Sequence, residues 1–137
     1  MGDQLITSMV VAASGMRAQG TRIRIISENI ANQNSTANEP GGDPYRRKIV
    51  TFQNYLDREL DTNLVRVRRI TEDQSPFGEI YDPQHPGADD RGYYQTPNVT
   101  GLIETMDMLE AQRTYQANVS VIQNTRTMVN STLELLR

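Results

Sequence analysis

Hydrophobic residues near the N-terminus recur at alternating steps of four and three positions. This heptad spacing places apolar side chains along one face of an α-helix. Gly15 and Gly20 within it each cost about 1 kcal/mol relative to alanine, which indicates close backbone approach or a bend. The pattern ends in the turn-forming residues 32–36, so we predict a helical segment over residues 1–34. Its helix-packing interface consists of Leu5, Met9, Ala12, Met16, Ile23, Ile26 and Ile30.

A second heptad series runs through the end of the chain, and no proline interrupts it. Thr100 is the expected N-cap, because its side chain can accept a hydrogen bond from a backbone N–H of the first turn. Glu104 and Asp107 lie near the positive end of the helix dipole. We predict a C-terminal helix within residues 98–137. Its packing interface consists of Met108, Tyr115, Val119, Ile122, Val129, Leu133 and Leu136.

Both predicted helices are long and carry apolar residues outside these interfaces. At about 1.5 Å per residue they would reach about 40 and 50 Å. Ile25 lies on roughly the opposite face from the N-terminal series, and Val121, Met128 and Leu135 form a second C-terminal set. A pair of helices would leave about half of each apolar surface in water. We therefore expect other chains to supply the missing cover.

The residues between the helices have a different composition. All six prolines and seven of the eight aromatic residues lie here, whereas all six methionines lie outside. Proline disrupts helices, and aromatic residues favour strands. Strand-like alternation of apolar and polar residues occurs at 45–53, 64–71 and 77–81. Residues 82–91 hold two prolines and three acids and are predicted to form a loop.

The predicted fold is mainly α. A long antiparallel coiled-coil pair of N- and C-terminal helices carries a small antiparallel β-hairpin or loop insert, which brings the chain back between them. We expect the N-terminal helix of the coiled-coil domain at 1–34, the β-rich insert at 35–97 and the C-terminal helix of the coiled-coil domain at 98–137.

Composition narrows the functional classes. A length of 137 residues suits one domain, and a formal charge of −3 does not favour general nucleic-acid affinity. The chain has no cysteine, so a disulfide, a thiolate metal ligand and a thiol nucleophile are excluded. The single histidine, His85, lies in a proline-rich stretch that makes a poor metal site, and no serine-nucleophile elbow or phosphate-binding glycine loop occurs. We expect no catalytic residue, no metal site and no cofactor.

Two basic clusters lie in the insert, at residues 45–48 and 66–69. One interpretation is a patch that binds phosphate or another polyanion. We favour the solvated face of a hairpin with salt bridges to neighbours such as Glu72 and Asp73, because the whole chain is acidic. The residues expected to make contacts from the insert are Tyr45, Arg46, Arg47, Arg66 and Arg68.

Motifs in all three segments resemble those of bacterial flagellar rod and hook proteins. The N-terminal motifs are ASGMRAQ at 13–19 and ISENIAN at 26–32. The motifs that look like the central region of one proximal-rod member are GGDPYRRK at 41–48, DQSPF at 73–77 and YDPQHP at 81–86. The motifs similar to the C-terminal helix of the family are PNV at 97–99 and AQRTYQAN at 111–118. The resemblance covers nearly the whole chain.

This resemblance implies a non-enzymatic subunit that assembles helically into the proximal rod, transmits torque and encloses the export channel. Members leave the cytoplasm through the flagellar type III export apparatus without a cleaved signal, and this N-terminus shows none. They lie in the periplasm between a membrane-embedded ring and the distal rod. The implied partners are further copies, other rod proteins and membrane-ring and export-gate components, with no nucleic acid and no small-molecule substrate. In the family, paired terminal helices form the inner tube, and the insert contacts neighbours outside it.

Two other functions fit parts of the sequence. A cytosolic coiled-coil adaptor or export chaperone would cover the same apolar faces with one helical client and would stay in the cytosol on fractionation. An anion- or nucleic-acid-binding module would use the two basic clusters and would bind with a strong dependence on salt.

Overall fold

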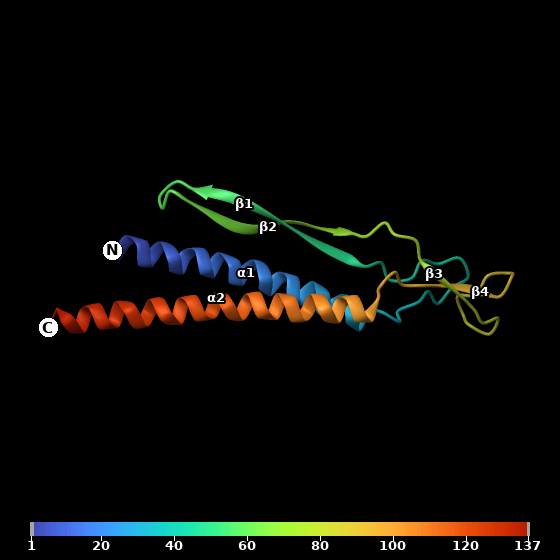
Figure 1. Ribbon diagram of the computed structural model, residues 1–137. Helices are drawn as coiled ribbons and strands as arrows, with labels where there is room; N and C mark the ends of the chain where they lie inside the picture. The colour runs from blue at the N-terminus through green and yellow to red at the C-terminus, as the bar shows by residue number, and fades with distance from the viewer. Residues whose placement is uncertain (1, 137) are drawn as a thin grey trace. The chain divides into compact units, whose positions relative to one another are not determined.

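The computed structural model describes residues 2–136, with one long helix at each end of this range and a β insert between them (Figure 1). In chain order the elements are α1 (Gly2–Ala31), β1 (Lys48–Asp57), β2 (Thr62–Glu72), β3 (Gly78–Tyr81), β4 (Tyr93–Thr96) and α2 (Gly101–Leu135). The fold is therefore mainly α with a small antiparallel insert, as predicted. The coiled-coil pairing of the helices and the segment boundaries at residues 34 and 97 stay predictions.

The chain folds into two compact units, and each long helix contributes to both. The first unit comprises Met1–Ile23, Val50–Arg69 and Leu109–Arg137, and the second comprises Arg24–Ile49 and Ile70–Met108. The first unit therefore holds most of both helices and most of β1 and β2. The second unit holds the end of α1, the start of α2 and the sheet of β3 and β4.

In the first unit, α1 and α2 run antiparallel. Arg22 Nη2 forms an ion pair with Glu110 Oε2 at 3.5 Å, whereas Gly15, earlier in α1, lies against Asn118, later in α2. A Cβ atom at Gly15 would lie 2.7 Å from Asn118 Nδ2, so this glycine permits the close approach that the sequence predicts. At Gly20, no other part of the described chain comes within 4 Å of such an atom. Only the first of the two glycines is thus explained by a contact within the chain.

The β1–β2 hairpin lies along the other side of α1 in this unit (Figure 1). The backbone N–H of Val65 in β2 donates a hydrogen bond to Ser14 Oγ at 3.4 Å. A groove of about 300 Å³ lies between α1 and the hairpin beside this hydrogen bond. Its lining consists of Ser14, Arg17, Ala18 and Thr21 of α1 and Tyr55, Val65, Arg66 and Val67 of the hairpin.

Three of the four strands lie where the sequence predicts them, with differences at their ends. Burial alternates as predicted along the middle of β2, whereas β3 is exposed throughout. β1 begins at Lys48, three residues later than predicted, because earlier backbone groups are bonded elsewhere. The N–H of Tyr45 donates to the Ser35 carbonyl at 2.9 Å, and that of Arg47 donates to Asn98 Oδ1 at 2.7 Å. Strand β4 does not stand out in the sequence, because its residues Tyr-Tyr-Gln-Thr show no alternation of apolar and polar side chains. Its pairing with β3, from Gly78 opposite Thr96 to Tyr81 opposite Tyr93, makes it a strand.

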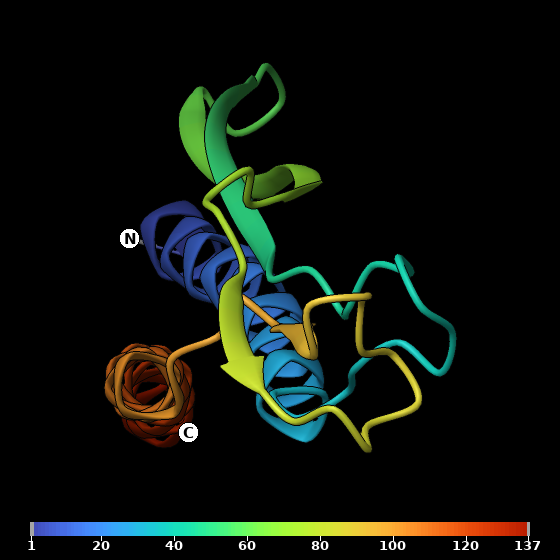
Figure 2. The ribbon, with the colours of Figure 1, turned by 90° about the vertical axis from the view of Figure 1, so that its right-hand side faces the viewer.

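In the second unit, the loop after α1 and the loop between β3 and β4 lie side by side (Figure 2). His85 joins them, because its Nδ1 accepts a hydrogen bond from the Gly87 N–H at 2.9 Å and its Nε2 lies 3.0 Å from Thr36 Oγ1. With Nδ1 as acceptor, Nε2 carries the proton and donates to Thr36. The imidazole stacks on Tyr94 with the ring centroids 3.8 Å apart. The loop at 82–91 is confirmed, and its histidine holds two loops together.

Most of the predicted helix-packing residues are buried or half-buried. Ala12 and Ile26 are buried, whereas Leu133 and Leu136 near the end of α2 are exposed. Ile25, which the heptad pattern places on roughly the opposite face of α1, is buried as well. The core of the described chain is small, because three of its six buried hydrophobic residues are alanines. These residues are Ala12, Ala18, Ile25, Ile26, Leu64 and Ala111.

Candidate functional site

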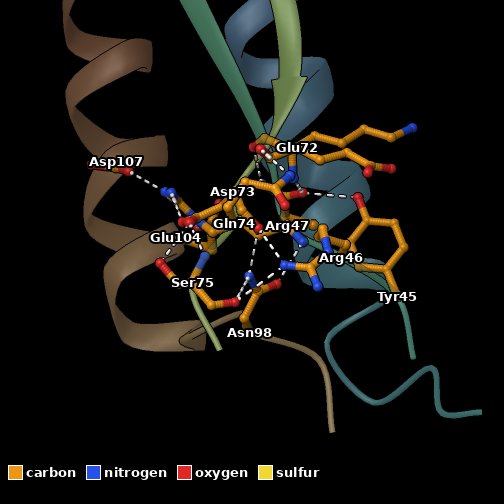
Figure 3. A network of polar contacts seen from close by, with 12 residues as sticks. Tyr45, Arg46, Arg47, Glu72, Asp73, Gln74, Ser75, Asn98, Glu104 and Asp107 are labelled. Atoms are coloured by element: carbon orange, nitrogen blue, oxygen red, sulfur yellow. Dashed lines mark hydrogen bonds and ion pairs between the residues drawn. The ribbon is translucent and has the colours of Figure 1, made fainter. Parts of the chain in front are cut away.

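A polar network in the second unit centres on Glu104, in the first turn of α2 (Figure 3). The Glu104 side chain is 0% exposed, and a buried carboxylate is stable only when it is paired and hydrogen-bonded. Arg47 Nε donates to Glu104 Oε1. The same guanidinium forms ion pairs with Asp73 Oδ2 at 3.4 Å and Asp107 Oδ2 at 3.5 Å. One arginine before β1 thus meets two carboxylates of α2 and one that follows β2.

Asn29, near the end of α1, supplies the second partner of Glu104. Its Nδ2 donates to Glu104 Oε2 at 3.1 Å and to the Lys48 carbonyl at 2.9 Å. Its Oδ1 accepts hydrogen bonds from the Lys48 N–H at 2.9 Å and the Tyr45 hydroxyl at 2.8 Å. Both donor hydrogens and both acceptor positions of this buried amide are therefore used. Asn29 pairs with the Lys48 backbone as a neighbouring strand would.

Asn98, just before α2, connects the network to the segment after β2. Its Oδ1 accepts from the Arg47 N–H at 2.7 Å, and its Nδ2 donates to the carbonyls of Asp73 at 3.0 Å and Ser75 at 3.1 Å. Arg46 Nη1 donates to the same two carbonyls, at 2.8 and 3.2 Å. The polar network therefore joins the end of α1, the base of the β1–β2 hairpin and the start of α2.

The pKa shifts in the network match the charges that it holds. Burial lowers the pKa of Arg47, but the hydrogen bonds and charges of Glu104 and Asp73 outweigh it and raise that pKa above its ordinary value. The pKa of Asp73 is lowered, chiefly because its carboxylate accepts hydrogen bonds from the Ser75 hydroxyl and backbone N–H. Burial and nearby carboxylates raise the pKa of Tyr45. At neutral pH, Arg47 and Asp73 are thus charged and Tyr45 is protonated, as their hydrogen bonds require.

The arrangement suits a structural role. Within residues 2–136, the one buried side-chain polar atom without a hydrogen bond is Gln19 Oε1, which lies in α1 and outside the network. No group of three or more histidine, aspartate or glutamate side chains in the described range could hold a metal ion. The network therefore consists of groups whose hydrogen-bonding capacity is used to hold four segments of the chain together.

The structure separates the five predicted insert-contact residues into two sets. Tyr45, Arg46 and Arg47 lie in the polar network, whereas Arg66 and Arg68 lie on β2 with exposed side chains. Arg47 makes a salt bridge to an acid that follows β2, as the favoured interpretation of the basic cluster predicts. It is, however, only 21% exposed and not part of a solvated face.

Four network residues are not found by sequence reasoning: Asn29, Asn98, Glu104 and Asp107. An acid in the first turn of a helix is already explained by the helix dipole, so nothing in the sequence indicates that Glu104 is buried. The one available signal is Asn29, a polar residue that shares a helix face with Ile25 and Ile26, four and three positions before it. Its partners come from distant segments, which a local pattern does not reveal.

Helix α2 carries a second feature, a set of large apolar side chains that the described chain leaves uncovered. In the first unit these are 42–87% exposed: Leu109, Val121, Met128, Leu133, Leu135 and Leu136. In the second unit they are 52–72% exposed: Leu102, Ile103 and Met106. Exposed apolar patches of this kind mark interaction sites. Neither described helix has the length and hydrophobicity needed to cross a membrane.

Comparison with known protein families identifies the class. The family model described as "Flagellar basal body rod FlgEFG protein C-terminal" matches residues 90–135, which include β4 and all of α2. The matched segment contains Asn98, Glu104 and the exposed apolar residues named above except Leu136, which follows the end of α2. The C-terminal third of this chain is therefore similar to proteins of the flagellar basal-body rod class.

Relatives named flagellar basal-body rod protein FlgC match nearly the whole chain. The protein of Agrobacterium fabrum is 48% identical over 98% of this chain and 97% of its own length. Those of Borreliella burgdorferi and Bacillus subtilis are 39% and 38% identical, over 97% and 93% of this chain and 98% and 95% of their own lengths. The chain belongs to the FlgC family of flagellar basal-body rod proteins. Its function is that of a structural rod subunit, and an adaptor or chaperone is not favoured.

Proposed function

We propose that this rod subunit assembles helically with copies of itself and with other rod proteins through the exposed face of α2. The observation that supports this most directly is the burial along the helix. Among residues 109–136, only Ala111 and Thr125 are buried, while six large apolar side chains are exposed. Apolar surface covered by a neighbour gains about 25 cal/mol per Å² from removal from water, and part of this offsets the entropy lost on association. Assembly thus supplies the burial that one chain lacks.

The paired terminal helices form the centre of the proposed assembly. In the first unit, a groove of about 450 Å³ is lined by Ala13, Met16, Arg17, Gly20, Tyr115 and Ile122. Three of these, Met16, Tyr115 and Ile122, are predicted packing positions. We infer that the helices within 1–34 and 98–137 pair as an antiparallel coiled coil whose grooves take side chains of neighbouring subunits. The insert at 35–97 then makes contacts farther from the centre.

Membership of the family suggests the route and the place of assembly. The subunit is exported through the flagellar type III apparatus and joins the rod in the periplasm, between the membrane ring and the distal rod. The absence of cysteine suits a chain that passes through in an unfolded state. In the rod it transmits torque, encloses the export channel and contacts membrane-ring and export-gate components. This function uses no cofactor and no catalytic residue.

Two charged substitutions on the exposed face of α2 test the assembly surface. Met128→Glu with Leu135→Glu places carboxylates at two exposed apolar positions seven residues apart. The matched control, Gln123→Glu with Asn130→Glu, has the same spacing and charge change at exposed polar positions on another side of the helix. We expect M128E/L135E to retain the helical content of the wild type and to abolish swimming and rod completion. The control variant should swim.

Isolated basal bodies and the periplasmic fraction separate assembly from export. The expected result for M128E/L135E is exported protein that is present in the periplasm and absent from basal bodies. Normal swimming with complete rods in this variant would show that the exposed apolar face is not an assembly surface. A wild-type chain found only in the cytosolic fraction would instead support the adaptor or chaperone.

A further inference from the structure

Charge is divided unevenly between the two units. The first unit contains nine arginines against six aspartates and glutamates, a formal charge of +3. The second contains five arginines and lysines against eleven aspartates and glutamates, a formal charge of −6. Together they give the −3 of the whole chain, which conceals the difference. Opposite charges on separate units provide complementary surfaces for contacts between copies.

The first unit presents its positive charge beside the groove between α1 and the hairpin. Arg17 and Arg66 both line this groove, and both are exposed. The Arg66 guanidinium lies 4.9 Å from the centroid of the Tyr55 ring. Arg68 is exposed and shares a strand face with Arg66, because side chains alternate along a strand. Within the described range none of the three arginines forms an ion pair, and we define Arg17, Tyr55, Arg66 and Arg68 as the basic face.

The second unit presents negative and apolar side chains along β3. Glu79 is exposed, and the neighbouring Ile80 and Tyr81 are 48% and 63% exposed. Asp90, in the loop that leads to β4, is exposed as well. Among the described strands β3 pairs with β4 alone, so its second edge is open. We define Glu79, Ile80 and Tyr81 of β3 together with Asp90 of the following loop as the acidic edge. Neither of its carboxylates forms an ion pair within residues 2–136, and the neighbouring Arg91 is paired with Asp89 at 3.5 Å.

We propose that the basic face of one copy binds the acidic edge of a second copy of this chain. The inference rests on the proposed function, since a self-assembling rod subunit has other copies beside it. The charges are complementary, and each surface offers an aromatic ring, Tyr55 or Tyr81, that can pack against arginine or apolar side chains. Because two different surfaces meet, each copy keeps one surface free for the next. Such heterologous contacts generate rings when the rotation between copies closes and open helical series when it does not, and the helical case is the one that a rod subunit requires.

Charge reversal on either surface tests this contact in the purified full-length chain. Arg66→Glu with Arg68→Glu reverses the basic face, and Glu79→Lys with Asp90→Lys reverses the acidic edge. We expect the wild type to self-associate at low salt in sedimentation velocity. The association constant of each variant should be lower by a factor of about ten or more. An equal mixture of the two variants should regain wild-type association, because each reversed surface then meets a complementary one.

The control variant, Arg58→Glu with Arg69→Glu, has the same charge change at exposed positions outside the basic face. Arg69 neighbours Arg68 on the opposite strand face, and Arg58 lies in the turn after β1. We expect this variant to associate like the wild type, with the same circular dichroism. Equal weakening in the control would show an effect of net charge alone and would overturn the proposal.

Three other results would also overturn the contact: a wild-type chain that stays monomeric at low salt, a mixture that shows no recovery, and arginine variants that change only heparin binding. The last would assign the arginines to a polyanion. None of these outcomes would contradict the proposed assembly role of α2, because that role is tested separately by M128E/L135E in the cell. If that variant blocks the rod while the charge variants associate normally, the proposed function stands and this contact does not.

Discussion

Replacing Arg47 with alanine tests the polar network of the second unit most directly. The change leaves the buried Glu104 carboxylate with one remaining partner, the Asn29 amide at 3.1 Å. Removing one member of a buried ion pair costs about 3–5 kcal/mol, because the other charge stays buried without compensation. The ion pairs with Asp73 and Asp107 are partly exposed and add about 0–1 kcal/mol each. We expect Arg47→Ala to lower the free energy of unfolding by about 3–5 kcal/mol.

The reciprocal change, Glu104→Ala, should be less costly. Arg47 would keep Asp73 and Asp107 and some contact with water, and Asn29 Nδ2 would keep the Lys48 carbonyl at 2.9 Å. We expect a loss of about 2 kcal/mol, close to the value of a hydrogen bond to a charged group. The double variant Arg47→Leu with Glu104→Leu leaves no buried charge and should be more stable than Arg47→Ala.

Urea unfolding followed by far-UV circular dichroism measures these differences. Arg69→Ala, at an exposed position on β2, is the control and should change the free energy of unfolding by less than about 0.5 kcal/mol. Amide exchange at residues 45–48 reports on the second unit directly if the two units unfold separately. Two results would refute the conclusion that Arg47 compensates a buried Glu104 charge. One is an equal loss of unfolding free energy in Glu104→Ala and Arg47→Ala, and the other is an Arg47→Ala variant as stable as the wild type.

Two further predictions concern the glycines of α1 and the loss of stability at low pH. Gly20→Ala should raise the free energy of unfolding by about 1 kcal/mol, since no other described segment lies within 4 Å of the new Cβ. Gly15→Ala displaces the Asn118 amide, so this variant should gain less stability or lose some. Thermal unfolding of the two variants checks this, and equal gains would contradict the close approach. Ser75→Ala removes the hydroxyl bond that most lowers the pKa of Asp73. A lowered carboxylate pKa contributes stability that is complete above the unfolded value of about 4 and is lost as the pH falls through the folded value. The variant should therefore lose less stability than the wild type on acidification, and an identical loss would exclude Ser75 as the cause.

Long-range periodicity made the helices predictable. The heptad series extend over many turns, so single interruptions such as Gln19 do not hide them, and the capping residue Thr100 marks the start of α2. The Glu104 N–H donates to the Thr100 carbonyl at 3.0 Å, as expected for the first helical hydrogen bond. Gly101 follows at the first helical position, where a Cβ would lie 2.7 Å from Gln33 Oε1. Close packing of the Gln33 side chain thus explains a residue that intrinsic helix propensity does not favour.

The polar network could not be predicted in the same way. Apart from the bonds between Ser75 and Asp73, its hydrogen bonds join residues that are far apart in the sequence, such as Asn29 with Glu104 and Arg47 with Asn98. The local pattern around each residue has an adequate explanation of its own: a helix terminus, a basic cluster or a turn. Only the fold shows that these separate explanations concern one buried group of side chains.

The buried polar network of the second unit and the exposed apolar side chains of the first differ in whether they need to be completed within one chain. This difference follows from the physics of each interaction. Hydrogen bonds and ion pairs are directional, and a buried charge with one partner missing is strongly destabilising, so the network around Glu104 has to be completed within one chain. The hydrophobic effect is non-directional and scales with the area covered, so apolar side chains such as Met128 and Leu135 can stay exposed until a neighbour covers them. Within the second unit, the network holds the end of α1 and the start of α2 together in the single chain. In the proposed assembly, the exposed apolar faces would contribute their stability to the rod and not to the free chain.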